Sequence, residues 1–244
     1  MSISKRQSEI LKIIEDSVYV SVNELASLTY TSASSIRRDL TVLQNLGLVK
    51  RSYGGVGLSK TVDKVAGFYS RSSQSIKEKR LIAKKAASLL RDGQSILLDS
   101  SSTAGFLLPY IAKLDSPVVF TNNLETAINA IRQGIHINCL GGASVNGSVA
   151  LAGSQTHKAL SCINVDIMFF SSQSLDADGL ISDSTEEENF VRQAMLERAK
   201  TKVFLCDSTK FGKRSLYGLA HLDDVDFAVF DKEYEGLSTS ATVL

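Results

Sequence analysis

Hydrophobic residues recur at helical spacing in three short runs within the first 58 residues. The repeating apolar positions are Ile10, Leu11 and Ile14, then Val22, Leu25 and Ala26, then Ile36, Leu40 and Leu43. The first run predicts a helix over residues 4–16. Ser21 and Glu24 form a capping-box pattern that begins a second helix of about two turns. Ser32 is positioned to cap a third helix, and Gly47 is positioned to end it.

A short hairpin is predicted directly after these helices. Residues 48–53 read as a strand, Gly54 and Gly55 as a tight turn, and residues 56–58 as the returning strand. The first 58 residues therefore read as a small helical unit that ends in a hairpin.

From Gly93 onward, short apolar runs alternate with helical ones. The expected strands are 95–98, 118–120, 135–140, 167–170, 203–205 and 227–230, and the expected helices are 104–114, 124–132, 156–162 and 186–199. Ser184 and Glu187 suggest a capping box for the last helix. This alternation predicts an α/β domain with a mostly parallel sheet.

The segment between the two patterns is polar and then basic. Residues 59–75 are serine-rich and read as a linker, and a basic amphipathic helix follows over about 75–90. Its expected inner residues are Ile82, Ala86, Leu89 and Leu90, and its expected outer residues are Lys77, Lys79, Arg80, Lys84 and Lys85. We therefore expect three parts: residues 1–58, a linker and basic connector over 59–92, and residues 93–244.

The formal net charge of +1 conceals a division between these parts. Residues 1–92 hold 16 Lys and Arg against 8 Asp and Glu, a balance of +8, whereas residues 93–244 hold 11 against 18, a balance of −7. A basic first part on an acidic second part indicates a polyanionic partner for the first part alone.

The second and third predicted helices fit within about 25 residues, as in a helix-turn-helix. In that motif the second helix enters the major groove of DNA through its N-terminal end, and a following hairpin can act as a wing near the phosphates. The candidate DNA contacts are Ser21, Ser32, Ser34, Ser35, Arg37, Arg38, Thr41, Lys50, Arg51 and Tyr53. The alternative is a small helical bundle with solvated arginines. The caps, the spacing and the local charge favour DNA binding.

At these residues the chain resembles the DeoR family of bacterial transcriptional regulators. The resemblance rests on residues 20–26, 34–40, 47–49 and 51–55, with the run Ile-Arg-Arg-Asp-Leu at 36–40 and the glycine pair at 54–55. It continues through residues 78–80, 92–93, 98–100, 121–122, 140–142, 166 and 207–212. The resemblance implies a winged helix-turn-helix and a Rossmann-like sensor body that is similar to sugar-phosphate isomerases. It also implies that this body binds a phosphorylated sugar or polyol.

The loops that follow several predicted strands carry hydroxyl, amide and glycine residues. In an open parallel sheet, ligands bind beyond the carboxyl ends of the strands. The candidate effector contacts are Asp99, Ser100, Ser101, Ser102, Thr103, Thr121, Asn122, Gly141, Gly142 and Lys210. Backbone amides and hydroxyls can hold a phosphate, and Lys210 supplies a positive charge. The alternative is that these are ordinary loop residues.

Two loops depart from the family pattern. Ser101 stands where the family usually has glycine, Ser102 where it has threonine, and residues 171–174 replace a glycine-containing stretch. If position 101 requires a positive φ, serine strains the loop. A regulator that has lost its effector is therefore an alternative.

A sugar-phosphate isomerase with a DNA-binding head is a further alternative. It would require a positioned base near the substrate carbon, and Asp99 is the candidate. No second acid or base is recognisable in the sequence, so we assign no catalytic residue and expect no enzyme activity.

Other features suggest no cofactor or metal. Cys139, Cys162 and Cys206 lie in or beside apolar segments, read as core residues and show no metal-type spacing. No apolar run approaches the ~18 residues of a membrane span, and the start of the chain lacks a signal-peptide core. We expect a cytoplasmic protein that binds double-stranded operator DNA as a homo-oligomer.

Overall fold

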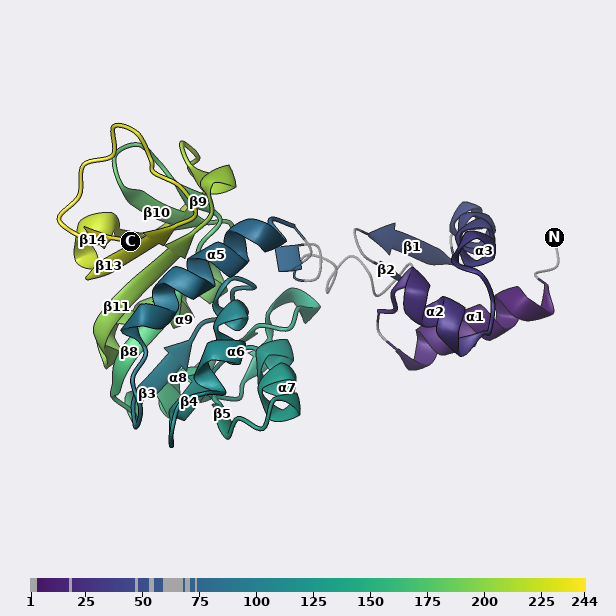
Figure 1. Cartoon of the computed structure of the whole chain (residues 1–244), viewed down its shortest axis with the longest axis horizontal. Coiled ribbons are helices and arrows are strands. Elements are labelled where there is room, and N and C mark those ends of the chain that lie inside the picture. The colour runs from purple at the N-terminus through teal and green to yellow at the C-terminus, as the bar shows by residue number, and fades with distance from the viewer. Residues whose placement is uncertain are drawn as a thin grey trace. The chain divides into compact units, whose positions relative to one another are not determined.

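The computed structural model describes residues 4–17, 19–46, 48–52, 55–58, 68, 71–72 and 74–244. The chain divides into two compact units, Met1–Gln74 and Ser75–Leu244, which we call the N-terminal and C-terminal units (Figure 1). Predicted features at Gly47, Tyr53 and Gly54, and most of the predicted linker, lie outside the described residues.

Between residues 4 and 58, the described part of the N-terminal unit contains three helices and a hairpin. These are α1 (Lys5–Asp16), α2 (Val22–Leu28), α3 (Ala33–Asn45), β1 (Val49–Ser52) and β2 (Gly55–Leu58). The capping box at Ser21 and Glu24 is present, and the Ser32 hydroxyl accepts a hydrogen bond from the Ser35 amide. Both predicted helix starts are therefore confirmed.

One apolar core joins the three helices to the hairpin. It includes the fully buried Ile10, Leu25, Ile36 and Leu40. A Cβ at Gly55 would lie 2.6 Å from the carbonyl oxygen of Val20, where Val20 bridges to the hairpin at Val56. Glycine is therefore required for the hairpin to approach the segment between α1 and α2.

The C-terminal unit contains the predicted α/β alternation and several further short strands. Its helices are α5 (Ile76–Ala86), α6 (Leu108–Ile111), α7 (Leu124–Arg132), α8 (Ser154–Ser161) and α9 (Glu186–Arg198), with short 3-10 turns between some elements. Its main strands are β3 (Ser95–Leu98), β4 (Val118–Thr121), β5 (Ile137–Cys139), β8 (Val165–Phe170), β11 (Ala199–Cys206), β13 (Phe227–Phe230) and β14 (Thr242–Val243).

These seven strands form one parallel sheet in the order β14-β13-β11-β8-β3-β4-β5. The chain proceeds outward from β3 to β5, returns to β8 and then proceeds in the opposite direction. This is the doubly wound, Rossmann-like order, and its switch point lies between β3 and β8. The predicted fold class is confirmed.

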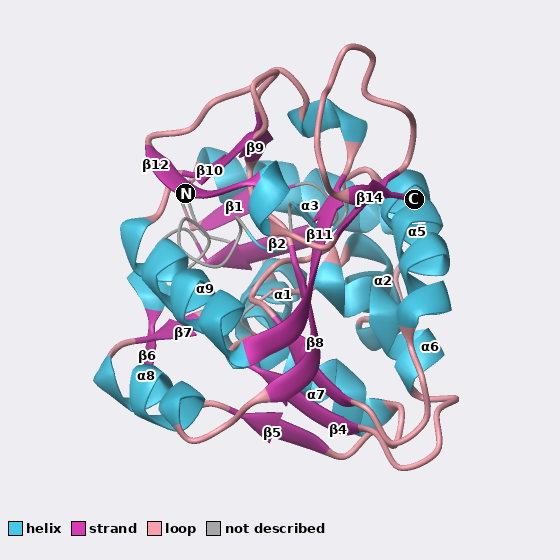
Figure 2. Cartoon of the chain, turned by 90° about the vertical axis from the view of Figure 1, so that its left-hand side faces the viewer, coloured by secondary structure: helices cyan, strands magenta, loops and turns pink. Residues whose placement is uncertain are grey.

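Helices cover both faces of the sheet. One apolar cluster joins α5, α6 and α7 to one face through residues such as Ile96 and Phe169, and the other joins α8 and α9 to residues such as Leu97 and Phe170. Figure 2 shows α8 and α9 on one side of β8 and β11, with α5 and α6 on the other. Neighbouring residues in β3 and β8 are thus buried on opposite faces, as in a central parallel strand.

A smaller antiparallel sheet was not predicted. It consists of β9 (Ser174–Leu175), β10 (Leu180–Asp183) and β12 (Tyr217–His221), in the order β12-β10-β9. A second two-stranded pair is formed by β6 (Ala143–Ser144) and β7 (Leu151–Ala152). Most of these strands are too short to show a period in the sequence.

Three details of the sequence prediction are wrong. Helix α9 begins after Thr185 without a side-chain cap, because the amide of Ser184 donates instead to the carboxylate of Asp183. Cys139 and Cys162 are exposed, and only Cys206 is a core residue. Lys79 lies on the inner side of α5, only 3% exposed.

Helix α5, which was expected in a separate connector, packs within the C-terminal unit. Ile82, Ala83 and Ala86 are fully buried against the sheet. No helix among the described residues is both long and apolar enough to cross a membrane.

Candidate functional site

The N-terminal end of α3 presents a cluster of hydroxyl groups. The Ser32 hydroxyl lies 3.0 Å from the hydroxyls of both Ser34 and Ser35 while it caps the helix. Ser21 caps α2 through the amide of Glu24. These serines therefore fix the two helix starts and leave short side chains at the end of α3 that would enter a DNA groove.

Arg37 and Arg38 are exposed in the first two turns of α3, whereas Ile36 and Leu40 are buried. The guanidinium of Arg51 in β1 donates to the Thr41 hydroxyl over 3.3 Å. This contact connects the hairpin to α3, so Arg37, Arg38, Thr41 and Arg51 belong to one surface. Lys50 is exposed on the same hairpin.

A further ion pair holds α1 against α3. Arg6 Nε lies 2.6 Å from Asp39 Oδ2, and Gln7 Nε2 donates to Asp39 Oδ1. The hydrogen bond from Arg6 to Asp39 raises the pKa of Arg6. Because Asp39 is buried next to the two exposed arginines, this pair sets the orientation of α3.

In the C-terminal unit, the predicted effector residues that follow β3 lie at the switch point of the sheet. Asp99 follows β3 and Ser171 follows β8, and the Ser171 amide donates to Asp99 Oδ2 over 3.4 Å. The Ser101 amide donates to Asp99 Oδ1 over 3.0 Å. The buried carboxylate of Asp99 thus joins the two loops where a parallel sheet offers a ligand crevice.

Arg192 of α9 binds three carboxylates at this position. It contacts Asp99 at 2.8 Å, Asp183 at 3.0 Å and Glu188 at 3.1 Å, and Glu188 also accepts the Ser100 hydroxyl. Burial alone would lower the pKa of Arg192, but the three carboxylates raise it, so the guanidinium stays charged. A buried arginine with three acceptors is a rigid structural hub.

Two lysines flank this hub and point to serine hydroxyls. Lys79 Nζ donates to Ser102 Oγ over 3.3 Å, and Lys210 Nζ donates to Ser171 Oγ over 2.9 Å. Lys210 also lies 3.4 Å from the Asp207 carboxylate. Two cations therefore reach the loops after β3 and β8.

Within the described part of the chain, Asn122 and Thr103 each carry a buried polar atom that has no hydrogen-bond partner. Asn122 Nδ2 donates to the Leu151 carbonyl over 2.9 Å, which leaves Oδ1 unbonded, and the Thr103 hydroxyl also lacks a partner. Thr121 lies level with Leu98 in the sheet, so the loops after β3 and β4 are adjacent. Unmade buried hydrogen bonds are rare and require an explanation, such as a ligand or an ordered water.

Gly141 and Gly142 lie beside Thr156 of α8. The Thr156 hydroxyl donates to the Gly141 carbonyl over 2.7 Å, and a Cβ at Gly142 would overlap Thr156 and lie 2.5 Å from the Ala152 carbonyl oxygen. Gly142 also lines a cavity of about 310 Å³ with Gly153 and Ser154. These glycines pack β6 and β7 against α8.

The serine substitutions do not strain the loops in the way that we expected. Ser101 is not among the described residues with positive φ, and its hydroxyl accepts the Ala104 amide over 3.2 Å. Ser171, Ser172 and Ser174 are buried and hydrogen-bonded, with Ser174 Oγ 2.7 Å from Ser215 Oγ. The expectation of a strained serine at position 101 is therefore wrong.

Models of two protein domains match the chain. The DeoR-like helix-turn-helix domain matches residues 6–62, and the DeoR C terminal sensor domain matches residues 74–232. The chain belongs to the DeoR family. It is a DNA-binding transcriptional regulator, with a helix-turn-helix in the N-terminal unit and a DeoR sensor domain in the C-terminal unit.

Characterised and uncharacterised regulators are similar along nearly the whole chain. The L-fucose operon activator of Haemophilus influenzae is 32% identical over 93% of this chain and 91% of that protein. The HTH-type transcriptional regulator GolR of Listeria innocua is 30% identical over 94% and 91%. The glycerol-3-phosphate regulon repressor of Haemophilus influenzae is 27% identical over 97% and 92%.

Solved structures that resemble the chain include D-ribose-5-phosphate isomerase in complex with phospho-erythronic acid. The TM-score is 0.43 at 16% identity, over 56% of this chain and 54% of that chain. The DeoR-family chain thus spans about half the length of this enzyme, and a likeness at this level says nothing about activity.

Six residues beside the switch point were not among the candidate effector contacts predicted from the sequence. They are Lys79, Ser171, Asp183, Glu188, Arg192 and Asp207. Two of them had a signal in the helical spacing. Lys79 lies three and four residues before the buried Ile82 and Ala83, and Arg192 lies three residues before the buried Met195. A charged residue on the apolar face of a helix indicates a buried ion pair or a ligand contact.

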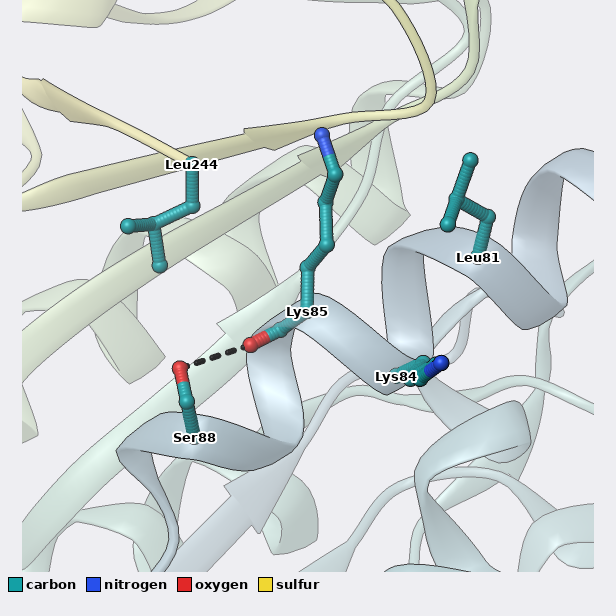
Figure 3. A pocket seen from close by; sticks show the side chains of 5 residues that line it. All are labelled: Leu81, Lys84, Lys85, Ser88 and Leu244. Atoms are coloured by element: carbon teal, nitrogen blue, oxygen red, sulfur yellow. Dashed lines mark hydrogen bonds between the residues drawn. The ribbon is translucent and has the colours of Figure 1, made fainter.

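A separate groove lies at the other end of α5. Leu81, Lys84 and Lys85 of α5 line it with Ser88 and Leu244, and it encloses about 490 Å³ (Figure 3). Lys85 Nζ donates to the Phe230 carbonyl over 2.9 Å, which fixes α5 against β13. Its lining is mainly apolar and lacks the convergent polar groups of the switch-point site.

Proposed function

We propose that this DeoR-family chain represses genes of carbohydrate metabolism, and that a phosphorylated sugar or polyol sets its operator affinity. The observation that carries the proposal is the pair of lysines, Lys79 and Lys210, that reaches hydroxyl-lined loops at the sheet's switch point. Two of the relatives reported above are named for a glycerol-3-phosphate regulon and a fucose operon, and these names support the same substrate class.

An incoming anion would approach the two lysines and not Arg192. Arg192 is already surrounded by Asp99, Asp183 and Glu188, so its donors are engaged. Lys79 donates to the Ser102 hydroxyl, and Lys210 donates to the Ser171 hydroxyl and lies 3.4 Å from the Asp207 carboxylate, so a phosphoryl group would displace the hydroxyls and compete with Asp207. The phosphoryl group would bind among Ser100, Ser101, Ser102, Thr103 and Lys210, with Lys79 as the added cation.

The carbohydrate part would extend toward the loop after β4. Asn122 Oδ1 can only accept, so it suits a hydroxyl group and not a phosphoryl oxygen. Thr121 would border this end. Gly141 and Gly142 would shape the wall through their contacts with Thr156 and Ala152.

Operator binding would use the serine cluster, Arg37, Arg38 and Thr41 of α3, with Lys50, Arg51 and Tyr53 from the hairpin. The effector would change operator affinity by its different affinity for two arrangements of the protein. We also propose a homo-oligomer in the cytoplasm, because a two-fold protein matches a two-fold operator.

An isomerase reaction has less support. Asp99 would be the base, but its two carboxylate oxygens already accept from Arg192 and from the amides of Ser101 and Ser171. A carboxylate held in this way is poorly placed to take a proton from a substrate carbon. We therefore propose binding without turnover.

Calorimetry with a panel of phosphates tests the proposal. Glycerol 3-phosphate, ribose 5-phosphate, fructose 1-phosphate, glucose 6-phosphate and inorganic phosphate are titrated into the full chain. At least one organic phosphate should bind below millimolar concentration, and Lys79→Met and Lys210→Met should each weaken it at least tenfold. Lys213→Met is the matched control, because Lys213 is an exposed lysine three residues from Lys210.

Each alternative has its own outcome in this experiment. Absence of binding across the panel would favour a regulator that has lost its effector. Conversion of ribose 5-phosphate or glucose 6-phosphate by pure protein would favour the enzyme. Equal effects of all three lysine substitutions would place the anion elsewhere.

A further inference from the structure

Helix α7 carries its large apolar side chains on the outside. Thr126, Ala127 and Ala130 are its buried residues, whereas Leu124, Ile128 and Ile131 are 42%, 45% and 67% exposed. A surface helix normally places its large apolar residues toward the core. The solvent-exposed face of α7 therefore has the composition that a core-facing helix surface usually has.

The three exposed residues form one continuous stripe. Their spacing is i, i+4 and i+7, so they align along about 10 Å of the helix at a rise of 1.5 Å per residue. Single exposed apolar residues are ordinary, but an aligned group of this kind marks an interaction site.

Charged residues flank the stripe in a specific order. Glu125 and Arg132 lie seven residues apart, two turns along the same side of the stripe, with Ile128 near the midpoint between them. The Asn129 side chain connects them, since its Nδ2 donates to Glu125 Oε1 over 3.3 Å and its Oδ1 accepts from Arg132 over 3.4 Å. One flank is therefore acidic at the start of α7 and basic at its end.

This order is complementary to itself when the helix is reversed. A two-fold axis that crosses α7 near Ile128 brings a second α7 alongside in the antiparallel direction. This axis places the charged flanks of the two copies on the same side of the interface. Glu125 of each copy therefore meets Arg132 of the other. A parallel two-fold arrangement would instead place the two charged flanks on opposite sides of the interface, so these ion pairs would not form.

We propose that two copies of this chain associate through α7, antiparallel, with Ile128 at the two-fold axis. The apolar stripes bury each other, and two Glu125–Arg132 ion pairs fix the direction. The inference rests on the proposed homo-oligomer and assigns its surface. It is independent of effector identity.

Analytical ultracentrifugation of the full chain tests the assignment. The wild-type chain should dimerise, and Ile128→Asp should weaken the dimer at least tenfold, because two carboxylates would meet at the axis. Phe190→Asp is the matched control, since Phe190 is 55% exposed on α9 and should leave association unchanged. Both positions are on the surface, and thermal melting of each variant verifies that it folds.

Charge reversal tests the direction of pairing. Glu125→Lys and Arg132→Glu should each weaken the dimer several-fold, and the double variant should restore it. A dimer that tolerates Ile128→Asp would overturn the α7 assignment and leave the proposed homo-oligomer intact. A wild-type chain that stays monomeric would overturn both, and failure of the double variant to recover would overturn the antiparallel pairing.

Discussion

A buried polar atom without a hydrogen-bond partner lowers the stability of the C-terminal unit. The Thr103 hydroxyl is buried without a partner in the described structure, and such a group costs about 1–3 kcal/mol. Its position in the loop after β3 coincides with the switch point of the sheet. A bound phosphoryl group would accept from this hydroxyl and recover the cost.

Replacing Thr103 by valine tests this interpretation. Without effector, Thr103→Val should raise the free energy of unfolding by roughly 1 kcal/mol, because the unbonded hydroxyl is removed at similar shape. The same change should weaken binding of the best organic phosphate about threefold to tenfold. Denaturant unfolding and calorimetry measure the two effects. A less stable variant with unchanged binding would indicate a water-bonded hydroxyl.

The lowered pKa of Asp207 predicts how the stability of the folded chain changes at acidic pH. Burial raises its pKa, but Lys210, the Thr209 hydroxyl and Lys79 outweigh burial and hold the pKa below the ordinary value. The folded pKa therefore lies below the unfolded pKa of about 3.9. The resulting stabilisation is complete at neutral pH and is lost as the pH falls below about 4.

The dependence of stability on pH should accordingly change in Asp207→Asn. Between pH 5 and pH 3, its free energy of unfolding should fall less steeply than that of the wild type, by up to about 1.4 kcal/mol per pH unit. Denaturant unfolding across this range measures the slope. Parallel curves would mean that Asp207 titrates equally in the folded and unfolded chain.

Helix α3 is the element proposed to contact the operator, and it is held rigidly in the N-terminal unit. Its buried stripe and the Arg6–Asp39 pair fix the helix, and its exposed side presents Arg37 and Arg38. Substitution of either arginine should therefore leave the fold intact.

Arg37→Ala and Arg38→Ala should each weaken operator binding. An arginine that reads a base should cost about 1–3 kcal/mol in a sequence-dependent way, and one that contacts a phosphate should reduce the salt dependence instead. Fluorescence anisotropy with operator DNA at several salt concentrations distinguishes these cases. Arg91→Ala, at an exposed arginine in the C-terminal unit, is the control. If neither α3 variant differs from that control, α3 is not the recognition helix.

The elements that sequence predicts well are those with a long period or a clear cap. The stripe Ile36, Leu40 and Leu43 identifies α3, and Ser21 with Glu24 identifies the start of α2. The small sheet of β9, β10 and β12 escaped prediction because its alignment depends on tertiary contacts, such as Asn189 donating to the carbonyl of Tyr217. The Arg192 hub escaped for the same reason, because Asp99 and Arg192 are 93 residues apart.

At the scale of the whole molecule, the charge division does not coincide with the two units, because the basic helix α5 belongs to the C-terminal unit. Residues 1–74 hold 10 Lys and Arg against 6 Asp and Glu, a balance of +4, and residues 75–244 hold 17 against 20, a balance of −3. Salt at 0.1 M screens carboxylates that lie more than about 10 Å from Lys79 and Lys210, whereas Asp207 lies 3.4 Å from Lys210 and would compete with a bound anion. We propose that operator binding by the N-terminal unit and effector binding by the C-terminal unit are thermodynamically linked.

The most direct test of that claim measures operator affinity with and without effector. An operator selected from random DNA is titrated with the full chain, and the titration is repeated at a saturating concentration of the organic phosphate that binds in calorimetry. We expect the operator dissociation constant to change about 5-fold to 150-fold, and to increase for a repressor that the effector releases. Lys210→Met should abolish the change and retain operator binding. An identical operator dissociation constant with and without the bound phosphate would contradict the proposed linkage between effector binding and operator binding.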